Sequence, residues 1–121
     1  MIRLKRVYEK FDITDGTRIL VERLWPRGVR KNTPNIDIHM KDVAPSNELR
    51  KWYAHDPAKW ESFKVKYRKE LDENPGPVSK LIEIVATNDT VTFVYAAKDT
   101  EHNGALFLAG YISEKLKHMK K

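Results

Sequence analysis

The feature that most constrains the fold is the run TVTFVYAA at residues 90–97. Apolar side chains fall on both faces of this run, which is typical of a central strand that is covered on two sides. A helical pattern follows almost at once, with apolar residues spaced to share one side of a helix. These residues are Ala105, Leu108, Ala109, Ile112 and Leu116. A buried strand followed by a helix favours an α/β fold with a mainly parallel sheet.

Three further strands are expected in the first third of the chain. Residues 2–8 alternate between apolar and charged side chains, and Asp15-Gly16 signals a turn. Residues 17–24 are rich in aliphatic side chains and predict a second strand, although their spacing also permits a helical turn. A loop is expected over 28–35 and a short strand over 36–40.

Three helices are expected between residues 40 and 90. The first covers 47–53 and has Ser46 as its N-cap. The second begins at Asp56-Pro57, because aspartate caps helices and proline is tolerated at the first helical position. A turn at 74–77 precedes the third, which ends near Asn88. Together, these elements predict one α/β domain over residues 1–121, with helices packed on the faces of a small, mainly parallel sheet.

Composition excludes several classes of site. The chain has no cysteine, which removes disulfides, iron–sulfur clusters, thiolate zinc sites and cysteine nucleophiles. Its four histidines show no metal-ligand spacing, and neither GxGxxG nor a Walker motif occurs, so we predict no metal site and assign no cofactor. No apolar run approaches the roughly 18 residues of a membrane span, and the N-terminus does not resemble a signal peptide. We therefore expect a cytoplasmic protein with no membrane partner.

The formal net charge of +6 favours anionic partners. Part of this excess lies in the tail, where cations stabilise a helix C-terminus for local reasons. The tail lysines are Lys115, Lys117, Lys120 and Lys121.

The segment RLWPRG at residues 23–28 is the first candidate site. Arg23 and Arg27 suit the paired recognition of carboxylate or phosphate, and Trp25 suits stacking on a flat group. The alternative is structural: Trp25 closes the edge of the core, and the arginines pair with Glu22 or Asp15.

The segment KDTEHNG at residues 98–104 is the second candidate site. Lys98 would add a positive charge beside a helix start that already attracts anions. Asp99 suits two roles, as the N-cap of the helix or as a partner that orients His102 for acid–base chemistry. Asn103 is a further candidate ligand contact.

A third group contains Lys41 and Arg50, which we also consider as ligand contacts. Ser46 and Arg50 are four residues apart and would share one side of a helix. Ser46 is expected to be a cap rather than a nucleophile, because no GxSxG elbow is present.

Ligands of parallel sheets bind beyond the carboxyl ends of the strands. RLWPRG and AAKDTEHN each follow a predicted strand, so we expect them to share a single cleft that favours anions. His102 and Asp99 are the candidate catalytic residues. The candidate ligand-binding residues are Arg23, Trp25, Arg27, Lys98, Asn103, Lys41 and Arg50.

Three long segments also carry a family resemblance: DGTRILVERLWPRGVRK, KDVAPSNELRKWYAHDPAKW and VTFVYAAKDTEHNGA. In this order they resemble the YeaO-like branch of a bacterial and archaeal domain-of-unknown-function family, from about Arg6 to Leu108. The resemblance implies a small α/β domain and no established activity. Longer members have D-V-R-x-x-P where this chain has Glu22-Arg23-Leu24-Trp25-Pro26, and they tend to carry cysteines near the segment YAAKDTEHN. This chain has none, so a thiol-dependent or metal role does not transfer to it.

Three hypotheses for the function follow. The first is a domain that binds or acts on a small anionic ligand, such as one with a phosphate group, through Arg23, Arg27 and Lys98. The second is nucleic-acid binding through Arg27, Arg30 and Lys31, although no recognised nucleic-acid motif is present. The third is a structural or interaction module without catalysis, as a monomer or a homodimer.

Overall fold

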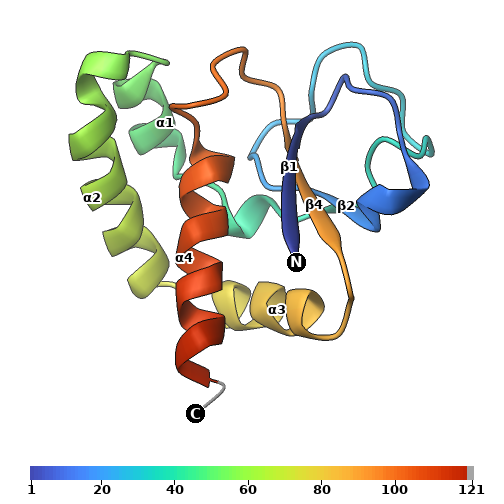
Figure 1. The fold of residues 1–121 in the computed structure, drawn as a ribbon. Helices are drawn as coiled ribbons and strands as arrows, with labels where there is room; N and C mark the ends of the chain where they lie inside the picture. Colours follow the sequence, from blue (N-terminus) through green and yellow to red (C-terminus); the bar gives the residue numbers. More distant parts are fainter. Residues whose placement is uncertain (120–121) are drawn as a thin grey trace.

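The computed structural model describes residues 1–119, which contain a four-stranded, fully parallel sheet (Figure 1). The strands are β1 (Ile2–Arg6), β2 (Thr17–Leu20), β3 (Ile38–His39) and β4 (Val91–Tyr95). Their spatial order is β1-β4-β2-β3, which places β4 at the centre. All five residues of β4 are buried, as the apolar run at 90–97 predicts. The predicted fold class, a single α/β domain with a parallel sheet, is confirmed. Lys120 and Lys121 lie outside the described residues.

Within residues 1–119, four α-helices and three short 3-10 helices complete the fold. The α-helices are α1 (Asn47–Tyr53), α2 (Trp60–Asp72), α3 (Pro75–Ala86) and α4 (Gly104–Met119). The 3-10 helices are η1 (Ile13–Asp15), η2 (Lys41–Val43) and η3 (Pro57–Lys59). Ser46 caps α1 by accepting a hydrogen bond from the Leu49 N–H, and Asp56 caps η3, so both predicted helix starts are confirmed. Among residues 1–119, no helix combines the length and the apolarity needed to cross a bilayer.

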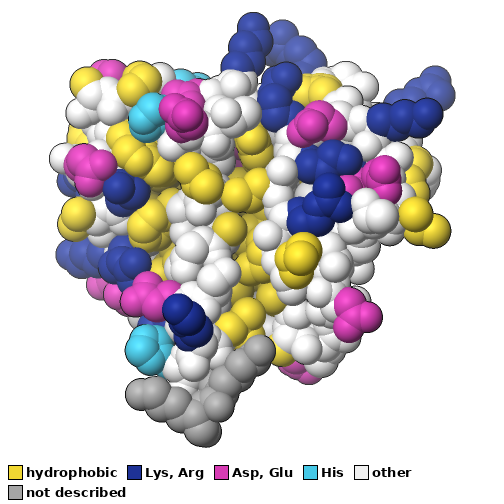
Figure 2. Space-filling view, in the orientation of Figure 1, with side chains coloured by type: hydrophobic (Ala, Val, Ile, Leu, Met, Phe, Trp, Pro, Cys, Tyr) yellow, Lys and Arg dark blue, Asp and Glu magenta, His cyan; other side chains and the backbone are white. Residues whose placement is uncertain are grey.

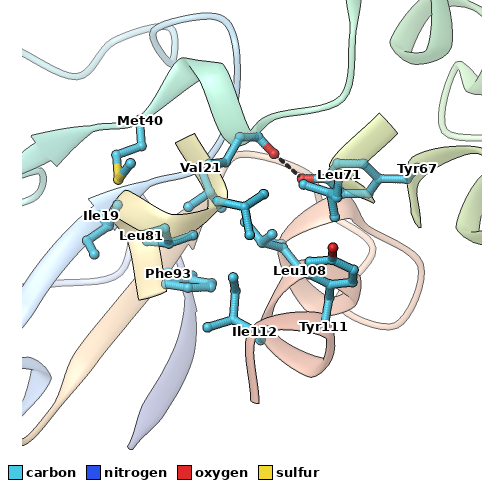
Figure 3. Packing of buried hydrophobic residues seen from close by; sticks show 14 of the residues in the cluster. Ile19, Val21, Met40, Tyr67, Leu71, Leu81, Phe93, Leu108, Tyr111 and Ile112 are labelled. Carbon is cyan, nitrogen blue, oxygen red and sulfur yellow. Dashed lines mark hydrogen bonds between the residues drawn. The ribbon is translucent and has the colours of Figure 1, made fainter. Parts of the chain in front are cut away.

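The main core lies between one face of the sheet and the helices. Figure 3 shows Ile19 and Phe93 of the sheet packed near Leu81 of α3 and Leu108 and Ile112 of α4. Aliphatic and aromatic side chains at helical spacing provide this surface, and their burial is the dominant stabilising contribution. The Tyr67 hydroxyl, fully buried on α2, donates a hydrogen bond to the Val43 carbonyl and ties α2 to η2.

The α-helices gather on one face of the sheet, and loops cover the opposite face (Figure 1). A smaller cluster on this loop side contains Val7, Leu20, Ile36 and Val94, with Trp25 packed against it. The predicted packing of helices on the sheet is therefore realised on one face, and residues 7–16 and 21–37 replace a helical layer on the other.

Beside this small cluster lies a buried ion pair that the sequence analysis did not identify. The side chains of Arg18 and Asp15 are both fully buried, and Arg18 Nη1 donates to Asp15 Oδ2 over 2.9 Å. Arg18 also donates to the carbonyls of Val7, Glu9 and Asn35. A single side chain on β2 therefore holds both covering loops against the sheet.

Strand ends and one turn differ from the sequence prediction. The first strand was predicted over 2–8, but β1 ends at Arg6. The second strand was predicted over 17–24, but β2 ends at Leu20. Beyond Leu20, the Glu22 carboxylate accepts a hydrogen bond from the Ala96 N–H. This side-chain hydrogen bond takes the place of the next backbone hydrogen bond between β2 and β4. The turn predicted at 74–77 is wrong, because α3 already begins at Pro75; proline fits the first helical turn, where its missing N–H is not needed.

Candidate functional site

The carboxyl ends of β2 and β4 lie side by side at the top of Figure 1, as the sequence analysis predicted for RLWPRG and AAKDTEHN. Glu22 joins the two segments, because its Oε1 accepts the Ala96 N–H over 3.0 Å. Burial raises the pKa of Glu22, and the hydrogen bond from Ala96 partly opposes that rise. His39 Nε2 donates to the Glu22 carbonyl over 2.7 Å. We call this region, residues 22–31 and 96–103, the carboxyl edge.

Arg23 and Trp25 both make structural contacts in the chain. Arg23 Nε donates to the Pro45 carbonyl over 3.2 Å, which holds the segment that leads into α1. Trp25 is half-buried and donates from Nε1 to the Val29 carbonyl over 2.6 Å. Its ring also packs on the loop-side cluster, so it closes the edge of the core, as the structural alternative predicted. Pairing of Arg23 or Arg27 with Glu22 or Asp15, the other part of that alternative, does not occur in the described structure.

Asp99 and His102 form the pair that the sequence analysis considered. His102 Nδ1 lies 2.9 Å from Asp99 Oδ2, and both side chains are about one-third exposed, at 33% and 36%. The Glu101 N–H and the His102 side chain hold the pKa of Asp99 below its usual value. A neutral His102 that donates from Nδ1 leaves Nε2 as a hydrogen-bond or proton acceptor. The His102 ring stands perpendicular to that of Trp60, at 5.6 Å between centroids.

The N-cap of α4 is Asn103, and the expectation that Asp99 fills this position is wrong. Asn103 Oδ1 accepts the Leu106 N–H over 2.8 Å, three residues into the helix. Asp99 instead accepts the N–H groups of Glu101 and His102 and so closes the turn before the helix. Asn103 Nδ2 donates to the Asp99 carbonyl, so its buried amide is engaged at both ends within the chain.

Asn103→Ala is expected to lower the free energy of unfolding by about 1 kcal/mol, because removing an N-cap side chain costs about that much. Urea denaturation would measure the loss, with Thr100→Ala as the control on an exposed neighbour. A loss no larger than that of Thr100→Ala would show that Asn103 does not stabilise α4.

The remaining candidates do not converge on one point. Lys98, Arg27 and Lys41 are exposed and form no ion pair among residues 1–119. Arg50 lies on α1 and donates from Nη2 to Asn47 Oδ1 over 3.3 Å. Its Nε is buried without a hydrogen-bond partner in the described structure.

Two surface hollows show how the site differs from the single cleft that was expected. Arg23 lines a hollow of about 290 Å³ with Ser46 and three carboxylates, which are Asp42, Glu70 and Glu73. This hollow is acidic on balance. Lys98 lines neither this hollow nor the larger one of about 450 Å³ between α2 and α4. The two segments therefore share an edge, and neither of these hollows is the anion-favouring cleft that was expected to join them.

Together, the fold and this edge define a small α/β domain with a parallel sheet and polar loops beyond its strand ends. A family model described as "Inactive DUF488-N3 subclade" matches residues 1–121, and the chain belongs to this family. It is 39% identical to the uncharacterized protein YeaO of Escherichia coli, over 92% of this chain and 96% of that protein. It is 40% identical to the uncharacterized protein Rv3073c of Mycobacterium tuberculosis, over 89% of this chain and 90% of that protein. The resemblance to the YeaO-like branch is thereby confirmed. No solved structure matches the chain.

Proposed function

We propose that this domain binds a small anionic ligand at its carboxyl edge without catalysing a reaction. The observation that carries the proposal is the composition of the loop after β2. Residues 23–31 contain four lysines and arginines and no aspartate or glutamate. None of these cations forms an ion pair among the described residues. The four are Arg23, Arg27, Arg30 and Lys31.

Cations without ion-pair partners create a positive surface potential that attracts anions, and exposed arginines offer paired donors to carboxylate or phosphate. Arg27 and Lys98 come from the two neighbouring strand ends and are both exposed. Figure 2 shows lysine and arginine side chains projecting from the top of the molecule, where the strands end. In this proposal Arg27 and Lys98 contact the anion, while Arg23 and Trp25 hold the loop in place.

The absence of catalysis is supported by the description of the family as an inactive subclade. It also fits the cysteine-free sequence, because the longer members that the chain resembles tend to carry cysteines near the carboxyl edge. The Asp99–His102 pair then positions or contacts the ligand and transfers no proton. A cytoplasmic, reducing setting agrees with the lack of cysteine.

Anion binding can be tested by calorimetric titration of the protein with pyrophosphate and with a panel of phosphate-bearing metabolites. The double variant Arg27→Ala/Lys98→Ala is expected to weaken binding by about tenfold or more, equivalent to 1.4 kcal/mol. The matched control is Lys80→Ala, which removes an exposed lysine from α3. The proposal fails if no anion binds the wild-type protein, or if the double variant binds as the wild type does.

Nucleic acid is the second candidate ligand, because Arg27, Arg30 and Lys31 are all exposed on the same loop. Fluorescence anisotropy with single-stranded oligonucleotides of increasing length separates the two candidates. Affinity that rises with length and falls steeply with salt would indicate a polyanion. Pyrophosphate binding without any length dependence would support the small ligand.

A further inference from the structure

A groove of about 450 Å³ runs between α2 and α4, away from the basic loop that follows β2. Its α2 side contains Trp60, Lys64 and Arg68, and its α4 side contains Phe107, Gly110 and Glu114. Figure 2 shows hydrophobic side chains exposed among charged ones over these two helices. The proposed anion site uses none of these six residues.

Gly110 is exposed in the middle of α4 and has no steric role in the part of the chain that the structure describes. A Cβ atom built at Gly110 would meet nothing within 4 Å. Glycine is a poor helix former, so the fold alone would favour alanine at this position. Ser113, one turn further along the same side, is also small and exposed. A helix surface without side-chain bulk permits close approach by another backbone.

The charges in the groove are balanced, unlike those of the chain as a whole. Lys64 and Arg68 line it with two carboxylates, Glu101 and Glu114, whereas the chain carries a net charge of +6. Arg68 Nη2 lies 3.3 Å from Glu114 Oε2, and both side chains are about half exposed. This balance does not favour a polyanion. It does suit a second copy of the chain, because a locally neutral surface lessens the repulsion between two basic molecules.

The aromatic residues of the groove are only partly covered. The guanidinium of Arg68 lies 5.4 Å from the ring centre of Phe107, and the Lys64 ammonium lies 5.5 Å from that of Trp60. Phe107 and Trp60 remain half-buried under these flexible side chains. A partner that displaced the cations would bury both rings, which is where interface energy concentrates.

We infer that this groove is the contact surface of a homodimer, in which α4 of each protomer packs into the groove of its partner. A twofold axis near Gly110 would bring the two α4 helices together at their least bulky point. Glu114 of each protomer would then exchange its own Arg68 for the partner's Arg68. Such an interface is self-complementary and closed, as most homodimer interfaces are.

Sedimentation equilibrium over a range of protein concentrations tests this inference. Wild-type protein is expected to form a dimer, and Gly110→Gln is expected to raise the dissociation constant by at least tenfold. The matched control Ser79→Gln adds the same side chain to an exposed position of α3 and should leave the dimer intact. Circular dichroism checks that both variants keep their helices. A wild type that stays monomeric throughout, or a dimer that Gly110→Gln does not weaken, overturns the inference.

A mixing experiment tests the exchanged ion pair directly. Arg68→Glu alone and Glu114→Arg alone each place like charges across the interface, so each variant is expected to be monomeric. In an equimolar mixture both exchanged pairs become oppositely charged, and a dimer with one copy of each variant should form. If mixing restores no dimer, the proposed arrangement of α4 is wrong. Neither substitution touches Arg27 or Lys98, so anion binding should persist in both variants whatever the outcome.

Discussion

Replacing Asp15 with asparagine is expected to lower the free energy of unfolding by about 3–5 kcal/mol, because it leaves a buried arginine without its counter-charge. The Asp15 side chain is fully buried, with Arg18 Nη1 at 2.9 Å and Lys5 Nζ at 3.0 Å from Oδ2. Asparagine keeps the size of the side chain and removes its charge. Arg18 would then remain buried among carbonyl groups, and the two loops that it holds would lose their anchor.

The acid dependence of stability provides a second readout for Asp15. Burial alone would raise its pKa, but hydrogen bonds from Lys5, from the Asp12 N–H and from Arg18 prevail and lower it. A carboxyl group whose folded-state pKa is lowered stabilises the fold above its unfolded pKa of about 3.9, and this contribution disappears as the pH falls through the folded value. The difference in stability between wild type and Asp15→Asn should therefore be full at neutral pH and should narrow in acid.

Chemical denaturation at several pH values would measure both effects. Asp89→Asn is the control, because Asp89 is exposed and its side chain makes no hydrogen bond or ion pair in the described structure. A loss for Asp15→Asn that is no greater than for Asp89→Asn would show that the buried pair does not hold the loops. If the stability difference between wild type and Asp15→Asn stays constant into acid, the charge of Asp15 is not the cause of the lost stability.

Sequence periodicity predicted the elements that build the main core. The run at 90–97 and the spacing of Ala105 to Leu116 gave β4 and α4, because a buried strand and an amphipathic helix each carry a local pattern. The ion pair of Asp15 and Arg18 carries no such pattern. Arg18 was counted within an aliphatic strand and Asp15 within a turn, and their pairing depends on two loops folding back over the sheet. One signal of a buried carboxylate was available in the sequence. Charged residues occur at alternate positions of β1, and two of them, Arg3 and Lys5, contact Asp15.

The candidate site was predictable to the level of strand ends. The order of the sheet places RLWPRG beside AAKDTEHN, as the rule for parallel sheets requires. The predicted single cleft between the two segments could not be tested by sequence alone, because a cleft depends on where loop side chains turn. Arg23 turns toward the carbonyls of Ala44 and Pro45. The local sequence around Arg23 does not indicate that these two residues lie close to it. Asp99 and Asn103 are both good capping residues four positions apart, and only the first turn of the helix decides between them.

Gly16 and Gly28 make a matched pair, because both adopt a positive φ angle that disfavours residues with a Cβ atom. Their φ angles are +64° and +80°. They differ in their surroundings. Among the described residues, a Cβ atom on Gly16 would overlap the Thr90 carbonyl oxygen, whereas one on Gly28 would meet nothing within 4 Å. The backbone penalty is thus common to the two sites, and the steric penalty is confined to one.

Gly16→Ala is therefore expected to destabilise the fold far more than Gly28→Ala. A positive φ costs a residue with a Cβ atom at least about 1–2 kcal/mol at either site. At Gly16 the Thr90 carbonyl must also move, and that carbonyl accepts the Thr17 N–H where β2 begins beside β4. We expect a total loss of roughly 3 kcal/mol or more, within the range of severe single substitutions. Urea denaturation of both variants measures the difference. Equal losses would mean that β2 and β4 can separate at their amino ends without cost, and the close approach at Gly16 would then not fix the start of the central strand pair.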